Sequence, residues 1–386
     1  MELTNVQKNE IILELLSKEG GINSLLSIIL NNLMKAERDI FLNTQRSSNN
    51  KGNGYRLGFA HGYGTQIELR IPRDRLSEFY PVILALIRDQ EELTYDLCFE
   101  LYSKGLTTRE IGDILEIIYG KHYSKSNISR INKSFYEEME QWRNRTLEAR
   151  YLVVYIDAIV VKVKRESIKN ESFYIVMGLT PEYKREILAI ECIPQESAKG
   201  WEEVLSKLKD RGVNEIELFV TDGLKSIEMS INKVFPKSSH QKCTVHLKRN
   251  ILSYVRKEHK KEILDDMNEV LNPDEKTYTK EKAMKQLSEF SKKWGKYYKY
   301  IRNLPQKEGI ENYFTYLEYD YRIRRMIYTT NWIERFNKSC RRTLKIRNSF
   351  PSPEAALAII TSVAIDKENK SYNYSIINFK FEPKFV

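Results

Sequence analysis

Asp157 has the surroundings expected of a catalytic or metal-binding carboxylate. It is the only acidic residue in the apolar run YLVVYIDAIVVKV, residues 151–163. An ionised carboxylate inside a hydrophobic strand is unfavourable unless it is paired or bound to a metal. The alternatives are a strand-end aspartate bonded to a neighbouring turn and one facing solvent at a sheet edge. The valines and isoleucines on both sides favour the functional interpretation.

Asp222 is a second candidate, because it ends another apolar run, IELFVTDG, residues 216–223. Ligands gather at the carboxyl ends of strands in open α/β sheets. An Asp-Gly turn or a cap on the next helix is the common alternative. If both runs are buried parallel strands, Asp157 and Asp222 lie on the same side of the sheet.

Glu334 is the only acidic residue among residues 321–347, which also contain nine Lys or Arg residues. A helix this basic is expected to line a phosphate channel, so its glutamate would face a metal or a cationic partner. Asn331 as N-cap with Glu334 at the third helical position, a variant of the capping box, explains the local sequence about as well. The predicted DNA-contacting residues of this helix are Arg335, Lys338, Arg341, Arg342 and Lys345.

Three carboxylates together suit phosphodiester chemistry. Cleavage needs an activated water or 3′-hydroxyl and a stabilised leaving oxygen, and two Mg²⁺ ions held by carboxylates can provide both. By contrast, Cys243 and His246 have the spacing of only half a zinc site. No second pair follows them, so a buried cysteine and a hydrogen-bonded core histidine are the preferred interpretation.

The segment GLTTREIGDILEIIYGKHYSKSNISRINKSFYEEM resembles a helix-turn-helix. Thr107 or Thr108 can cap a first helix, and Ser124 or Ser126 a second. An ordinary helical hairpin is the alternative, but the basic charge favours DNA binding. The residues predicted to contact DNA from the second helix are Lys125, Asn127, Ser129, Arg130 and Lys133.

The elements that must position these residues follow from the hydrophobic pattern. Two helical patterns within residues 5–42 precede a polar linker, a hairpin around His61–Gly64 and a helical stretch over residues 78–145. Strands are predicted at 151–163, 172–179, 186–194 and 216–223, with an amphipathic helix at 198–212. Three strands in a meander and a crossover to a parallel strand predict a mixed α/β sheet. Residues 247–320 are helical in pattern.

Composition limits the class of protein. The formal charge of +10 and the pI of about 9.1 favour a polyanionic partner. No apolar run is long enough to span a bilayer, and the polar N-terminus does not resemble a signal peptide. The four cysteines are scattered without a CxxC pair, which indicates a reducing cytoplasm.

Several blocks occur in a characteristic order. RIPRDRLSEFYP, GLTTREIGDIL, SKSNISRI and WRNRTL precede YIDAIVVKV, FVTDGLKSI, QKCTVHLKRN and TTNWIERFNK. Together they resemble the mutator-type transposases of bacterial insertion sequences, part of the DDE transposase superfamily, over nearly the whole chain.

The resemblance implies an RNase H-like fold with a mixed five-stranded sheet and flanking helices. It implies that Asp157, Asp222 and Glu334 are catalytic ligands of two Mg²⁺ or Mn²⁺ ions, with no organic cofactor. Cys243 and His246 match the family's C-x-x-H block, and His246 is a candidate contact to the scissile phosphate. Ala158 departs from the glycine that usually follows the first aspartate of the family.

The resemblance also implies an all-α insertion before the glutamate helix and an α-helical N-terminal DNA-binding region. The predicted divisions are a helical region (1–50), a DNA-binding region (51–145, helix-turn-helix at about 106–138), the first part of the core (150–246), the insertion (247–325), and the remaining core with the tail (326–386).

The predicted function is a DNA transposase that binds terminal inverted repeats, cleaves strands with metal, and transfers a 3′-hydroxyl to target DNA. The predicted partners are double-stranded DNA and a second copy of the chain in a homodimer, and no membrane is involved. The predicted location is the bacterial cytoplasm, in association with the nucleoid. A catalytically inactive DNA-binding repressor and a sequence-nonspecific RNase H-like nuclease are the alternatives. Trp294 or Trp332 could stack on a flipped base, although core packing is the preferred role of both.

Overall fold

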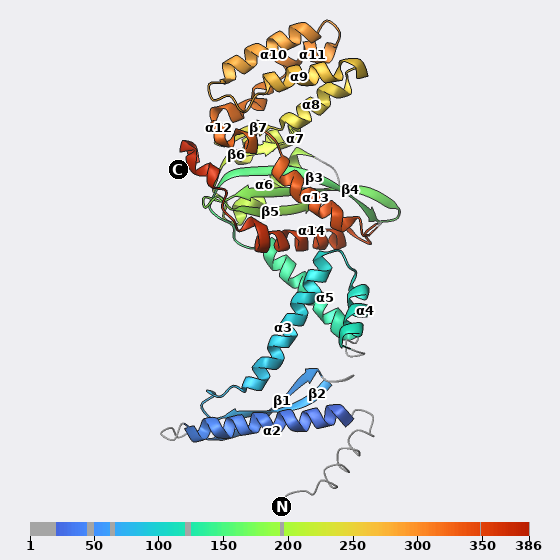
Figure 1. Ribbon diagram of the computed structural model, residues 1–386, viewed down its shortest axis with the longest axis vertical. Helices are drawn as coiled ribbons and strands as arrows, with labels where there is room; N and C mark the ends of the chain where they lie inside the picture. Colours follow the sequence, from blue (N-terminus) through green and yellow to red (C-terminus); the bar gives the residue numbers. More distant parts are fainter. Residues whose placement is uncertain are drawn as a thin grey trace, which may run out of the picture. The chain divides into compact units, whose positions relative to one another are not determined.

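The computed structural model describes residues 21–44, 50–61, 66–119, 125–193, 197–347 and 349–385 (Figure 1). The chain divides between Glu137 and Glu138 into two compact units. The earlier of the two predicted N-terminal helical patterns, the hairpin turn and the turn of the helix-turn-helix lie outside the described residues.

The first unit contains a hairpin packed against a long helix. Its elements are α2 (Gly21–Thr44), β1 (Gly52–His61), β2 (Gln66–Asp74), α3 (Val82–Ser103), α4 (Thr108–Tyr119) and most of α5 (Lys125–Arg143). Strands β1 and β2 pair antiparallel, which confirms the predicted hairpin. Ile67, Leu69 and Ile71 alternate with exposed residues along β2 and are buried in one cluster with Met34 of α2.

Helix α4 begins with the predicted cap. The Thr107 hydroxyl accepts a hydrogen bond from the Glu110 backbone N–H at 3.2 Å, and the Glu110 carboxylate accepts one from the Thr107 N–H at 2.7 Å. This reciprocal capping box satisfies two backbone donors at the helix start. It explains why the helix begins at Thr108.

The second unit is built on one mixed sheet. Its strands are β3 (Arg150–Lys164), β4 (Ile168–Leu179), β5 (Arg185–Cys192), β6 (Glu215–Thr221) and β7 (Ser239–Lys242), in the order β5-β4-β3-β6-β7. The β5-β4-β3 pairs are antiparallel, and β6 and β7 are parallel to β3. The four strands predicted from apolar runs and the five-stranded mixed sheet are confirmed.

Helices cover both faces of this sheet. The helices involved are α6 (Ala198–Asp210), α7 (Lys225–Val234), α13 (Asn331–Leu344) and α14 (Pro353–Lys367). Val154 and Ile156 share a buried cluster with Trp201 of α6 and Ile231 of α7. The intervening Tyr155 contacts Trp332 of α13, with ring centroids 5.6 Å apart. Alternate β3 residues therefore face α6 and α7 on one side and α13 on the other.

Every described element between β7 and α13 is helical. These elements are α8 (Thr244–Ser253), α9 (Lys260–Val270), α10 (Lys280–Trp294), α11 (Lys299–Arg302), α12 (Tyr321–Ile327) and short 3₁₀ turns at Lys257–His259, Leu304–Gln306, Ile310–Tyr313 and Thr315–Glu318. Figure 1 shows α8–α11 gathered beyond the β6–β7 side of the sheet. Trp294 is buried here, and its Nε1–H donates to Asp266 at 2.6 Å, which supports the packing interpretation.

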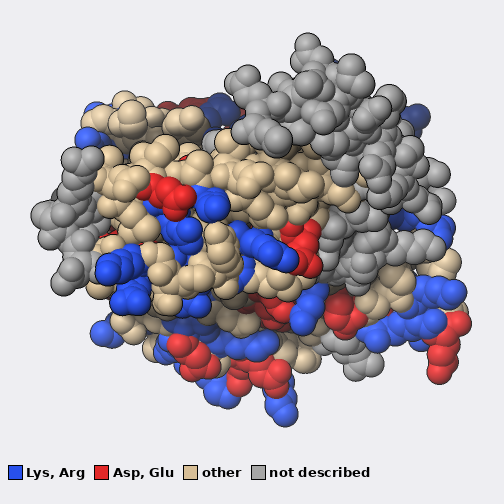
Figure 2. Space-filling view, turned by 90° about the horizontal axis from the view of Figure 1, so that it is seen from below, with Lys and Arg blue, Asp and Glu red and all other residues tan. Residues whose placement is uncertain are grey.

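A π-helical turn, Glu368–Tyr372, continues α14, and the last described elements are the 3₁₀ turns Ile377–Phe381 and Pro383–Phe385. Among the described residues, none of the helices has both the length and the apolar character to cross a bilayer. On the face shown in Figure 2, basic and acidic side chains are interspersed beside a broad uncharged area. The described basic residues therefore do not form a continuous basic surface on that face.

Candidate active site

Strands β3 and β6 place the two predicted aspartates at the same position along neighbouring strands. The strands are parallel with Tyr155 beside Val220, so the same register continued by two residues puts position 222 beside 157. Side chains alternate along a strand, and both positions therefore belong to the face that α13 covers. Ala158 points the other way, because its methyl packs against the cluster of α6 and α7. It therefore does not narrow the space beside Asp157.

Asp157 is partly buried and bonded to α13. Asn337 Nδ2 donates to Asp157 Oδ2 at 2.8 Å, and Asn337 is completely buried. Burial raises the pKa of Asp157, and the nearby Glu334 carboxylate raises it further, while the backbone N–H of Ala158, His246 and Asn337 lower it. Within the described chain, no Lys or Arg forms an ion pair with Asp157. The edge-exposed alternative therefore does not apply.

Asp222 combines the position of a site residue with the role of a turn residue. It follows β6 directly, and its Oδ1 accepts a hydrogen bond from the Leu224 backbone N–H at 3.2 Å. Gly223 has a φ of 87°, a left-handed conformation that favours glycine. The Asp-Gly turn predicted as an alternative therefore forms, and it fixes the carboxylate at the strand end.

Glu334 lies in the first turn of α13, partly buried. The capping-box interpretation with Asn331 as N-cap is wrong: Thr330 is the N-cap, and no side chain caps the helix. The Thr329 hydroxyl instead accepts from the Asn331 N–H at 3.3 Å. Glu334 is thus not engaged at the helix start, and its carboxylate lies within electrostatic reach of Asp157.

His246 lies near Asp157 and Asp222, and Cys243 lies next to His246. The Cys243 N–H donates to the Thr221 carbonyl at 2.7 Å, and the Thr330 hydroxyl donates to its sulfur at 3.4 Å. Burial acts to raise the pKa of the Cys243 thiol, but polar interactions with His246 and Thr330 outweigh it and lower that pKa.

The proximity of Cys243 raises the pKa of His246 against the effect of burial, and Asp222 and Asp157 raise it further. His246 Nδ1 is buried without a hydrogen-bond partner in the described chain, so its interaction with the Cys243 thiol is electrostatic. Cys243 is buried as preferred from the sequence, while His246 belongs to the surroundings of the two aspartates.

These side chains share one electrostatic neighbourhood without forming a finished ligand set. Across the part of the chain that the structure describes, no three His, Cys, Asp or Glu side chains are arranged to hold a metal ion together. The donor chemistry nonetheless suits a hard cation, because the carboxylates of Asp157 and Glu334 repel each other. The metal triad therefore remains a prediction.

The basic residues of α13 are on the surface: all five predicted DNA contacts, Arg335, Lys338, Arg341, Arg342 and Lys345, are exposed. The second predicted set begins α5. The side chains of Lys125, Asn127, Ser129 and Arg130 lie outside the described residues. Lys133 is exposed and pairs with Glu137 at 3.7 Å. Both sets stay predictions.

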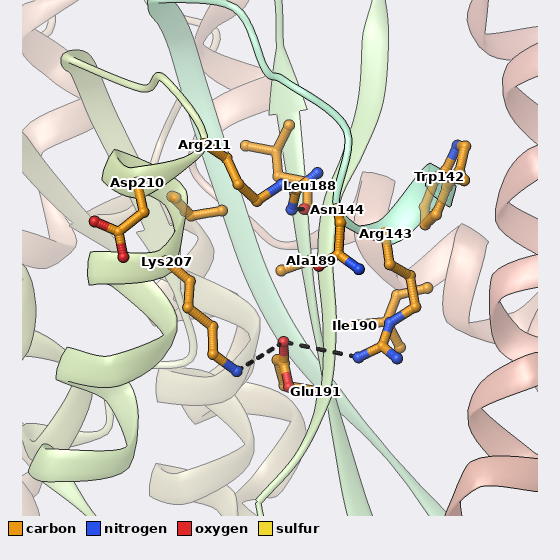
Figure 3. Close-up of a pocket in the computed structure, with 11 residues that line it drawn as sticks. Trp142, Arg143, Asn144, Leu188, Ala189, Ile190, Glu191, Lys207, Asp210 and Arg211 are labelled. Carbon is orange, nitrogen blue, oxygen red and sulfur yellow. Dashed lines mark hydrogen bonds and ion pairs between the residues drawn. The ribbon is translucent and has the colours of Figure 1, made fainter. Parts of the chain in front are cut away.

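A well-formed pocket of about 280 Å³ lies elsewhere, between β5, α6 and the end of α5 (Figure 3). Figure 3 shows Arg143 and Lys207 reaching toward Glu191, at 3.9 and 3.5 Å. The carboxylate already balances both cations, and no predicted site residue lines the pocket.

Asn337 is the residue that sequence reasoning missed. It belongs to the buried stripe of α13, with Ile333, Phe336, Cys340 and Leu344. A polar residue in an apolar stripe needs a buried partner, and this was the available signal. Only the packing of α13 on β3 identifies that partner as Asp157.

Comparison with known proteins shows which proteins this chain is similar to. A family model described as "Transposase, Mutator family" matches residues 1–374. The transposase for insertion sequence element IS905 of Lactococcus lactis subsp. lactis (strain IL1403) is 33% identical, covering 86% of this chain and 84% of that protein. That for IS1201 of Lactobacillus helveticus is 33% identical, covering 89% and 95%. That for IS256 in transposon Tn4001 of Staphylococcus aureus is 28% identical, covering 92% of each.

Proposed function

Because this chain belongs to the Mutator family of transposases and is a DNA transposase, we propose that Asp157, Asp222 and Glu334 form its catalytic centre. Metal-dependent strand cleavage would expose a 3′-hydroxyl, and the same centre would join it to target DNA. We propose an RNase H-like core for the second unit, and the strand order β5-β4-β3-β6-β7 supports it. The first unit would recognise the terminal inverted repeats.

The setting of Asp157 carries this proposal. Its carboxylate is partly buried without a Lys or Arg ion pair in the described chain, and it lies within electrostatic reach of His246 and Glu334. Perturbed titratable groups of this kind cluster at functional sites. Asn337 would hold the Asp157 carboxylate in one orientation through its N–H donor.

Mg²⁺ or Mn²⁺ would be held by Asp157, Asp222 and Glu334. When bound, the ions would stabilise charge on the attacking and leaving oxygens. His246 lies beside the two aspartates, where its ring could donate to a non-bridging oxygen of the scissile phosphate. Two element ends must be joined together, so we propose that at least two copies act. Activity on the element's DNA would take place in the cytoplasm, at the nucleoid.

Ala158 does not favour the catalytically inactive alternative, because its methyl packs away from Asp157. A strand-transfer assay with a labelled terminal repeat, target DNA and Mg²⁺ or Mn²⁺ tests the proposal. Wild type should give cleaved and joined products, and Glu334→Gln should give neither while still binding the repeat. Glu258→Gln, at a glutamate side chain that is 64% exposed, should match wild type.

Each alternative predicts a distinct result in the same assay. A repressor would bind the repeat and yield no products with any variant. A nonspecific nuclease would cut unrelated DNA equally well and yield no joined products.

A further inference from the structure

A groove lies along the edge of β3 beyond the candidate active site. The parallel pairing of β6 with β3 ends at Tyr155, and the next described partner on that edge is Phe350, which bridges to Val163. The Phe350 N–H donates to the Lys162 carbonyl at 3.0 Å, and the Lys164 N–H donates to the Phe350 carbonyl at 2.8 Å. Between these two pairings, the edge of β3 has no strand partner among the described residues.

A pocket of about 370 Å³ occupies this gap, where β3 faces the last turns of α13. Its charged lining is entirely basic within the described part of the chain: Lys162, Arg341, Lys345 and Arg347. The first three form no ion pair with a described residue. Val160, 61% exposed, and Phe350 contribute apolar surface.

The pocket lies at the C-terminal end of the side of α13 that carries Glu334. Arg341 and Lys345 follow Glu334 by seven and eleven positions, close to whole helical turns, so all three share one side of the helix. From Asp157 the free edge runs for about 20 Å to the Phe350 bridge, at roughly 3.3 Å per residue. Lys162 alternates with Asp157 onto the opposite face of β3 and reaches the pocket at the open edge of the strand. A DNA strand held at the acids and leaving along this edge would therefore meet Arg341 and Lys345 from the α13 side and Lys162 from the other side.

We propose that this gap binds an unpaired single strand of DNA adjoining the scissile phosphate. The inference rests on the proposed function. The pocket in this gap has the volume of a site for one small molecule, which is too small to enclose a DNA duplex. Lys and Arg would contact phosphates, bases or sugars would lie against Val160 and Phe350, and unpaired β3 backbone groups would offer hydrogen bonds.

The test measures binding of the full chain, without divalent metal, to two fluorescent forms of the terminal repeat. One is fully paired, and the other carries a six-nucleotide single-stranded extension. Lys162→Ala combined with Arg347→Ala should weaken binding of the extended form about tenfold and lower its salt slope by about 1.4, because roughly 0.7 is lost per phosphate contact. Binding of the paired form should change less than twofold.

Val160→Glu places a carboxylate in the groove at an exposed position, so it should reproduce this selective loss without affecting folding. A double variant at exposed lysines elsewhere, Lys237→Ala with Lys292→Ala, should affect both DNA forms equally and slightly. Equal losses on both forms for the groove variants, or no loss on the extended form, would overturn the inference. Failure of wild type to bind either form would instead contradict the proposed function.

Discussion

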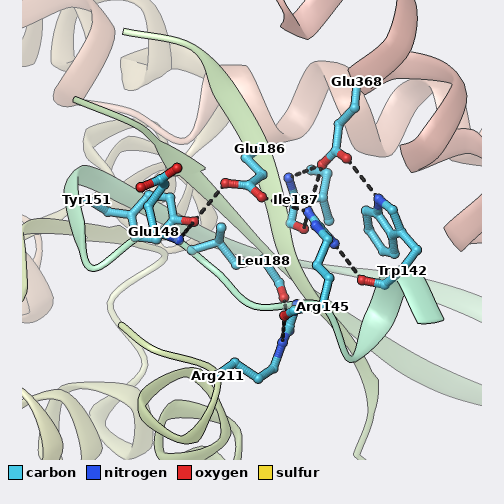
Figure 4. A network of polar contacts seen from close by, with 9 residues as sticks. All are labelled: Trp142, Arg145, Glu148, Tyr151, Glu186, Ile187, Leu188, Arg211 and Glu368. Atoms are coloured by element: carbon cyan, nitrogen blue, oxygen red, sulfur yellow. Dashed lines mark hydrogen bonds and ion pairs between the residues drawn. The ribbon is translucent and has the colours of Figure 1, made fainter. Parts of the chain in front are cut away.

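Two partly buried carboxyl groups of the second unit, Asp157 and Glu368, have opposite kinds of charged neighbours. Burial raises the pKa of Glu368 to about 6, and it also raises that of Asp157. Glu368 accepts hydrogen bonds from the Ile187 N–H at 2.6 Å, Trp142 Nε1 at 2.9 Å and Arg145 at 3.3 Å (Figure 4). Asp157 accepts one from Asn337 and has the His246 ring and the Glu334 carboxylate as titratable neighbours.

The difference separates a structural carboxylate from a functional one. At Glu368 the chain supplies the cation, and the network ties the end of α5 to β5 and α14. At Asp157 the described chain supplies a second acid and the His246 ring but no Lys or Arg ion pair, so a bound cation would complete the charge balance. A divalent ion is the partner that oxygen ligands of this kind favour.

Asp157→Asn should give the largest effect. Strand transfer should fall by roughly 10³-fold or more, equivalent to about 4 kcal/mol of activation free energy. The free energy of unfolding should stay unchanged or rise, because an unbalanced buried charge is removed. Rate measurements and urea unfolding check both parts, and a variant that unfolds easily would make Asp157 a structural residue instead.

Glu368→Ala should show the reverse pattern. Removing one member of a buried charge pair should lower the free energy of unfolding by about 3 kcal/mol, while strand transfer by the folded protein stays within about threefold of wild type. Trp142 fluorescence reports on the network directly. Glu140→Ala, which removes a surface pair with Arg143, should cost less than about 1 kcal/mol. Equal decreases in the free energy of unfolding for Glu368→Ala and Glu140→Ala would contradict a structural role for the Glu368 network.

Asn337→Ala should lower strand transfer by about 10- to 100-fold, because an outer-shell partner orients a metal ligand. The Mg²⁺ concentration for half-maximal activity should rise, which a purely structural role would not produce. Asn331→Ala, at an exposed asparagine of the same helix, is the matched control. An unchanged Mg²⁺ requirement in Asn337→Ala would limit Asn337 to packing.

The pH dependence of stability should give the smallest effect. Glu368 has a pKa of about 6 in the folded protein against an ordinary 4.5, so the folded state binds more protons between these values. Its contribution to the free energy of unfolding is therefore present below about pH 4.5 and lost as the pH rises through 6, by at most about 2 kcal/mol. Wild type compared with Glu368→Gln isolates this term. The free energy of unfolding of wild type minus that of Glu368→Gln should fall as the pH rises. A value that stays constant or rises with pH would contradict the prediction.

The sequence predicted those elements whose residues carry their own pattern. The β3 and β6 runs are β-branched and apolar, so their burial is visible locally. The family resemblance implies a fifth strand but not its position, and the short polar segment SHQK of β7 has no strand pattern of its own. Gln241 is bonded to the backbone of Tyr313 and Tyr316, and Thr315 to the His240 carbonyl.

The candidate site also contains residues that local sequence identifies and contacts that only the fold creates. Asp157 and Asp222 could be proposed because a charge in or at the end of an apolar strand is conspicuous. The capping-box interpretation of Glu334 failed because local sequence does not specify which residue precedes the first helical turn. The link from Asn337 to Asp157 joins residues far apart in the chain, and only the packing of α13 on β3 creates it.

Iron-directed cleavage of the polypeptide tests the central claim most directly. Fe²⁺ in place of Mg²⁺, with ascorbate and peroxide, generates radicals that cut the backbone near the bound ion, and mass spectrometry locates the cuts. We predict cuts near Asp157, Asp222 and Glu334 that Mg²⁺ suppresses and Asp157→Asn abolishes. Cuts that avoid Glu334, or that Mg²⁺ does not suppress, would contradict a shared metal centre.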